Sequence, residues 1–74
     1  MSIRIDGIFY VLDAISDFVL AGLLAECRDR FRICSMHKNR TAEIEKMQQE
    51  YACRIQACKQ EIERRETRRV RVAA

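Results

Sequence analysis

The residues best suited to chemistry are four cysteines and one histidine, and their spacing does not match a common metal site. Structural zinc sites usually pair cysteines two to four residues apart. Six residues separate Cys27 from Cys34, four separate Cys53 from Cys58, and only Cys34 lies close to His37. A free cysteine at helical spacing behaves as a small buried hydrophobe. We therefore predict reduced, structural cysteines, over the alternatives of a metal or a disulfide, and we predict no metal ligand and no cofactor.

Two carboxylates, Asp13 and Asp17, lie four residues apart and would share one face of a helix. Such a pair could serve as an acid and a base or hold a cation. The sequence has only one histidine, His37, and offers no nucleophile beside a base. We therefore predict salt bridges for these carboxylates, no catalytic residues and no enzymatic activity.

Arginines are concentrated near the end of the chain, where they could contact phosphate groups or an acidic protein surface. Glutamates interrupt the run, and no aromatic residue is interleaved to stack on bases. Nucleic-acid binding by a small dimer is therefore an alternative rather than the leading prediction. The candidate contacts are Arg64, Arg65, Arg68, Arg69 and Arg71.

A long apolar run, residues 8–25, dominates the first half of the chain. Its apolar residues recur at steps of three and four, which predicts a helix, and we extend this helix over about residues 8–34. A helix that is apolar nearly all round must be buried in protein or in lipid. We predict that the following residues form a core and dimer interface: Ile8, Leu12, Ile15, Val19, Leu20, Leu23, Leu24 and Phe31.

A membrane span over residues 8–25 is a second alternative, because the run is just long enough to cross a bilayer. Asp13 and Asp17 oppose it, since an aspartate near the centre of a span costs about 2.5–3.5 kcal/mol. The sequence has no recognisable secretory signal, so we expect a cytoplasmic protein.

The second half of the chain predicts a turn at about residues 35–40 and a helix over about residues 41–69. Ser, Asn and Thr in the turn region favour caps and turns, although one continuous helix stays open as an alternative. Residues 70–74 are predicted as a flexible tail or a short strand, which could pair with a strand at residues 2–5. The apolar stripe of the second helix is Ile44, Met47, Tyr51, Ile55 and Ile62.

These elements predict one all-α domain over residues 1–74, an antiparallel helical hairpin with possible short terminal strands. Reversal near Asn39 would bring the Asp13 and Asp17 carboxylates next to the arginines at the end of the second helix. A chain of 74 residues has a marginal core by itself. Because the narrow stripe of the second helix cannot cover the first helix, we expect a homodimer that forms a four-helix, coiled-coil-like bundle.

A polar-apolar strand followed by two helices, Ser2–Ile5 and the rest of the chain, resembles the ribbon-helix-helix DNA-binding family. That resemblance implies a dimer in which the strand reads the major groove of DNA. The predicted helices are much longer than those of the family, and the first is more apolar, so we do not assign the chain to it.

The leading functional prediction is a small non-enzymatic protein that associates with itself through its first helix and binds a partner protein. The net charge of +3 is uneven, since residues 1–26 are acidic overall and residues 54–74 are basic. Short, self-associating chains without a recognised motif are typical of accessory proteins, including phage- or plasmid-encoded inhibitors of a host protein.

Overall fold

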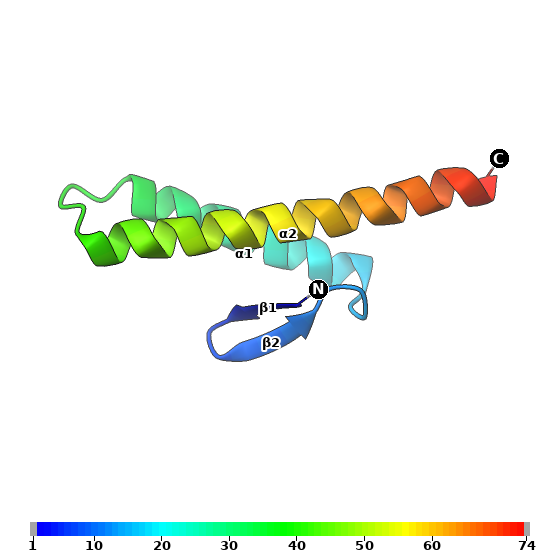
Figure 1. Ribbon diagram of the computed structural model, residues 1–74, viewed down its shortest axis with the longest axis horizontal. Helices are drawn as coiled ribbons and strands as arrows, with labels where there is room; N and C mark the ends of the chain where they lie inside the picture. The colour runs from blue at the N-terminus through cyan, green and yellow to red at the C-terminus, as the bar shows by residue number, and fades with distance from the viewer. Residues whose placement is uncertain (1, 74) are drawn as a thin grey trace.

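The computed structural model describes the backbone of residues 2–73 and the side chains of residues 2–69. Strands β1 (Ser2–Ile5) and β2 (Ile8–Val11) are followed by helices α1 (Asp17–Ser35) and α2 (Ala42–Ala73). The two helices lie side by side, and the strand pair packs across them (Figure 1). The chain is thus mostly helical, as predicted, with a short antiparallel sheet at its start.

The strands form a tight β-hairpin around Asp6 and Gly7. Both turn residues have positive φ angles, 52° for Asp6 and 79° for Gly7. Two-residue hairpin turns of type I′ require this geometry and favour the Asp-Gly sequence. The predicted strand at residues 2–5 is therefore confirmed, but its partner is β2, with Ile5 opposite Ile8 and Ser2 opposite Val11.

The prediction that the first helix begins at residue 8 is wrong. Residues 8–11 form a strand, because they are β-branched or aromatic and follow the Asp-Gly turn. Helix α1 begins only at Asp17, where the Ser16 side chain accepts a hydrogen bond from the backbone N–H of Val19 at 3.2 Å. A serine at this position satisfies one of the N–H groups left free at a helix start.

The predicted reversal between the helices is confirmed. Helix α1 ends at Ser35, and α2 begins after Thr41, whose hydroxyl accepts a hydrogen bond from the Ile44 N–H at 3.3 Å. Gln48 in α2 donates a 2.7 Å hydrogen bond back to the Ser35 hydroxyl. The antiparallel packing of the two helices therefore extends to the helix ends that flank the loop.

The end of the chain differs from the prediction. Helix α2 continues through Ala73, so residues 70–73 are helical rather than a strand beside residues 2–5. Ala74 lies outside the described residues. The 32 residues of α2 run along nearly the whole 51 Å length of the molecule, and its end extends beyond α1 (Figure 1).

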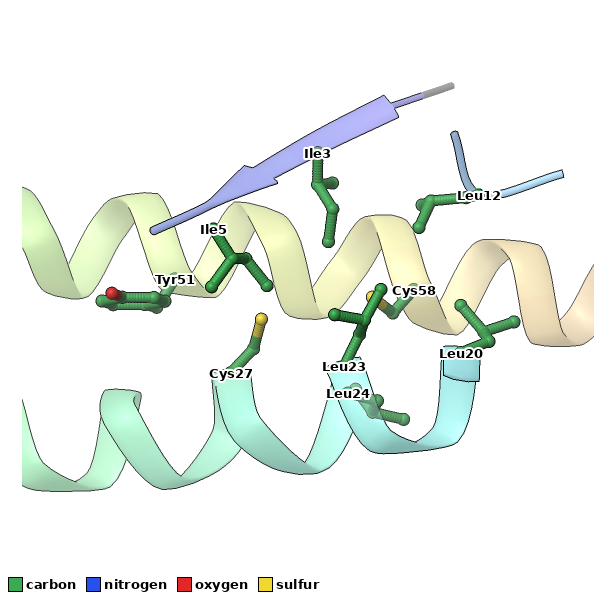
Figure 2. Packing of buried hydrophobic residues seen from close by; sticks show 9 residues of the cluster. All are labelled: Ile3, Ile5, Leu12, Leu20, Leu23, Leu24, Cys27, Tyr51 and Cys58. Carbon is green, nitrogen blue, oxygen red and sulfur yellow. The ribbon is translucent and has the colours of Figure 1, made fainter. Parts of the chain in front are cut away.

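The core lies between the two helices and the hairpin (Figure 2). Strand β1 points Ile3 and Ile5 towards the helices, so the hairpin covers part of α1 that α2 leaves open. This arrangement removes the main reason for expecting a second copy over the core face of the first helix. The buried cluster contains Ile3, Ile5, Leu12, Leu20, Leu23, Leu24, Cys27, Tyr51 and Cys58.

The membrane alternative does not match this structure. The proposed span, residues 8–25, is divided into a strand, a turn and the start of α1. Among the described residues, neither helix is both long enough and apolar enough to cross a membrane.

Candidate functional site

Arg65 in α2 joins three parts of the chain through one guanidinium group. Its Nε donates to Glu61 at 2.8 Å, and its Nη1 donates to Asp17 at the start of α1 at 2.7 Å. Its Nη2 donates to the backbone carbonyls of Leu12 and Ile15, each at 2.7 Å. The planar guanidinium can make all these bonds at once because its donors point in fixed, divergent directions. Arg65 therefore holds the β2–α1 connection against α2.

The surrounding ion pairs extend this arrangement, which we call the Arg65 cluster: Asp17, Glu61, Arg64, Arg65 and Arg69. Arg64 also donates to Glu61, and Arg69 also pairs with Asp17. The predicted juxtaposition of the Asp17 carboxylate with the arginines of the second helix is thus confirmed. The hydrogen bonds to Glu61 raise the pKa of Arg64, and the charge of the nearby Asp13 carboxylate adds a smaller contribution. Arg68 lines an open pocket together with Asp13, Asp17 and the other arginines.

Glu61 is the buried carboxylate of the cluster, with 6% of its surface exposed. Hydrogen bonds from Arg64, and then from Arg65, lower its pKa from the ordinary 4.5 to about 2. A buried carboxylate is expected to be paired in this way, because an unpaired buried charge is strongly unfavourable. Sequence reasoning treated Glu61 as an exposed residue that interrupts a basic run, although its spacing from Arg64 and Arg65 was a signal for pairing.

This pairing predicts an acid-sensitive contribution to stability. Because the pKa of Glu61 is lower in the folded state, its contribution is complete above about pH 4.5 and decreases as the pH falls towards 2. We expect a smaller loss of unfolding free energy over this range in Glu61→Gln than in the natural protein. Some loss should remain, because arginine hydrogen bonds also lower the pKa values of Asp6 and Asp17. Urea titrations between pH 6 and pH 2 would test this, and equal losses in both proteins would contradict it.

A second arginine, Arg30 in α1, attaches the hairpin turn to the helices. It donates two hydrogen bonds to the Asp6 carboxylate, at 2.8 and 2.6 Å, and one to the Tyr51 hydroxyl at 3.0 Å. It also pairs with Glu26 at 2.7 Å. The sequence spacing could have indicated the Glu26 pair. Sequence reasoning missed the contacts with Asp6 and Tyr51, which depend on the position of the hairpin.

The predicted interface of the first helix is divided between the inside and the surface. Leu12, Leu20, Leu23 and Leu24 are buried in the chain's own core, and Ile15 and Phe31 pack against it. Ile8 and Val19 are exposed. Most of the apolar surface assigned to dimerisation is therefore already covered within one chain.

The predicted stripe of the second helix faces α1 only in part. Tyr51 is buried, and Ile55 and Ile62 pack against the core. Ile44 is half-buried, whereas Met47 is exposed.

Several large apolar side chains lie on the surface of β2 and at the start of α1. The exposed fractions are 55% for Ile8, 68% for Phe9, 50% for Val11 and 89% for Phe18. Sequence reasoning missed Phe9, Val11 and Phe18 as surface residues, because it placed them all in a buried helix. A second exposed group, Ile33, Met36 and Met47, lies near the loop between the helices.

Two of the four cysteines, Cys27 and Cys58, belong to the buried core cluster. Cys27, Cys34 and Cys58 are buried, Cys53 is exposed, and all four are free thiols. In the described part of the chain, no group of three or more potential ligands could hold a metal ion. Burial raises the pKa of the Cys58 thiol to about 11 and also raises the pKa of Cys27.

This difference in burial predicts the order of alkylation. We expect iodoacetamide at pH 8 to modify Cys53 first, and Cys27 and Cys58 at least about 100-fold more slowly, because the reactive thiolate is both scarce and covered there. Mass spectrometry of timed samples would measure the rates, with Cys53→Ser and urea-unfolded protein as controls. Similar native rates for Cys53 and Cys58 would contradict the packing.

The predicted phosphate contacts do not form one uniform basic surface. Arg64, Arg65 and Arg69 pair with Glu61 or Asp17, and Arg65 is 16% exposed. Arg68 is exposed on the same helix. The side chain of Arg71 lies outside the described part of the structure.

Comparison with known proteins returns no matching family model, no matching curated protein and no matching solved structure.

Proposed function

We propose that this protein is a small non-enzymatic binding protein that associates with itself and with a partner protein through exposed apolar side chains. The observation that supports this proposal is the exposure of Phe9, Val11 and Phe18 in a chain that has enough other apolar residues to form a core. Large exposed apolar groups often mark interaction sites, since covering them releases free energy in proportion to the area removed from water.

Attachment of the hairpin to the helices would favour binding by this surface. Arg30 and Arg65 attach the hairpin and the β2–α1 connection to the helices by several hydrogen bonds each. A surface that is already ordered loses less conformational entropy when it binds. The arginine-rich end of α2 would supply a charged margin, and nucleic-acid binding there stays the alternative because Arg64 and Arg69 are 50% and 67% exposed.

The experiment compares two apolar surfaces of the same protein. Phe9→Ser/Phe18→Ser removes the exposed aromatic groups of β2 and of the start of α1, and Ile33→Ser/Met36→Ser is the matched control near the interhelical loop. We expect sedimentation equilibrium to show similar self-association of the natural protein and the control, and a higher dissociation constant for the first variant. Quantitative affinity purification from the native cell should lose the same partner with the first variant only.

Two outcomes would reject the proposal. One is a natural chain that is monomeric and retains no partner that depends on the Phe9 and Phe18 side chains. The other is nucleic acid as the retained species, with affinity that falls linearly with the logarithm of salt concentration, which would favour the alternative.

A further inference from the structure

Strand β2 extends beyond the helical layer that supports β1. The inward-facing residues of β1, Ile3 and Ile5, are only 7% and 4% exposed. Their cross-strand partners are Tyr10, which is half-buried, and Ile8, which is 55% exposed. The hairpin therefore rests on the helices through β1, and β2 forms its outer strand, farther from the helices (Figure 1).

The outer edge of β2 has an unusual chemical character for an edge strand. In a two-residue hairpin, Ile5 and Ile8 exchange hydrogen bonds, so the N–H and C=O of the next residue, Phe9, point away from β1. Within residues 2–73 the sheet has two strands, so no strand covers this edge. Exposed edges are usually protected by charged residues, proline or bulges, whereas residues Ile8–Val11 contain neither charge nor proline.

We propose that β2 pairs with β2 of a second copy of this chain, antiparallel across a two-fold axis at Phe9, to form a four-stranded sheet. This inference rests on the proposed self-association and gives it a geometry. Phe9 would exchange two backbone hydrogen bonds with its own counterpart, and Ile8 would lie opposite Tyr10 of the other copy. The carbonyl of Val11 already accepts a hydrogen bond from Ala14 at 3.0 Å, which favours an axis at Phe9 over one nearer the turn into α1.

Charge favours self-pairing through β2, because two-fold pairing brings identical strands together and any charge on them would repel its own copy. The strand is uncharged, so two copies can approach without repulsion. The opposite edge of the sheet carries Arg4, and pairing there would bring like charges close together, which is destabilising. Arg4 instead lies over the Phe9 ring of its own chain, 5.5 Å from the ring centroid. Two short strands bury less area than a standard interface, so we expect a weak dimer in the micromolar range.

The test depends on the Phe9 N–H group, which points away from β1 and towards the proposed second copy. Phe9→Pro removes a donor that β1 does not use, but it removes the hydrogen bond to the second copy. Phe9→Val keeps the N–H and the strand preference, and Phe18→Ser is a control at an equally apolar, 89% exposed site. In sedimentation equilibrium we expect Phe9→Pro to raise the dimer dissociation constant at least about 100-fold, with less than about tenfold changes for both controls.

A second measurement requires no substitution. In the natural protein, hydrogen exchange at the Phe9 amide should slow as concentration rises through the dissociation constant, while the amide of Arg4 on the opposite edge should not change. This readout applies even if Phe9→Pro fails to fold.

The outcomes separate the strand pairing from the broader proposal. A dimer that dissociates in Phe18→Ser but persists in Phe9→Pro would overturn the pairing and retain self-association. If the protein dimerises but the exchange rate of the Phe9 amide does not depend on concentration, the pairing is likewise overturned and self-association is retained. A natural chain that stays monomeric up to about 500 μM, well above the micromolar range expected for a weak dimer, would overturn the pairing together with the self-association on which it rests, whereas the affinity purification tests partner binding separately. Binding of β2 to a strand of another protein, without dimerisation, would also overturn the pairing.

Discussion

Leu20→Ala is expected to lower the free energy of unfolding by about 2–5 kcal/mol. Leu20 is 1% exposed and lies in α1 among side chains from α2 and the hairpin side of the core. Removing three carbons there loses the transfer free energy of the buried groups and leaves a cavity that rigid neighbours fill only partly. Because small domains are marginally stable, this loss is a large part of the total. Urea unfolding followed by circular dichroism at 222 nm would measure it.

Phe18→Ala is the matched control for this substitution. Phe18 lies two residues before Leu20 in the same helix, but it is 89% exposed. We expect a change within about 0.5 kcal/mol for the monomer, as is usual for a surface substitution. If Leu20→Ala leaves too little stability to measure, Leu20→Met keeps most of the volume and should cost less than about 1.5 kcal/mol. Equal effects at Leu20 and Phe18 would contradict the packing of α1.

Arg65→Met is expected to produce the second large loss of stability, clearly greater than that of Arg64→Met. Both arginines pair with Glu61, but Arg65 alone of the two also donates to Asp17 and to the carbonyls of Leu12 and Ile15. Where water cannot replace the lost donor, a carbonyl left without a hydrogen bond lowers the free energy of unfolding by about 1–3 kcal/mol. The Arg65 substitution should also loosen the β2–α1 connection, whereas the Arg64 substitution leaves it attached.

The comparison has two readouts. The urea midpoint should fall more for Arg65→Met than for Arg64→Met, and amide exchange in residues 12–16 should accelerate only in the former. Arg65→Lys should recover part of the loss, since lysine retains the charge but cannot present several fixed donors at once. Equal midpoints for the Arg64 and Arg65 variants would show that the guanidinium contacts with the β2–α1 connection do not stabilise the fold.

Features that depend on local chemistry were predictable from the sequence. The strand at residues 2–5 follows from its alternating pattern, and the loop between the helices follows from residues that favour caps and turns. The Asp17 pair with Arg65 was predictable as well, because an antiparallel reversal places opposite ends of two helices together. The Asp6-Gly7 hairpin was also encoded locally, as two residues suited to positive φ angles between apolar segments.

The apolar run over residues 8–25 shows what the sequence pattern alone could not determine. A run without clear alternation is compatible with a buried strand or a buried helix, since hydrophobicity does not distinguish them. The tertiary structure decided which residues became the core, because β1 covers α1 and leaves β2 outside. Leu20 and Phe18 have similar hydrophobicity, yet one is buried and the other exposed. Burial depends on which surfaces meet, and Arg30 and Arg65 hold the hairpin in the position that determines it.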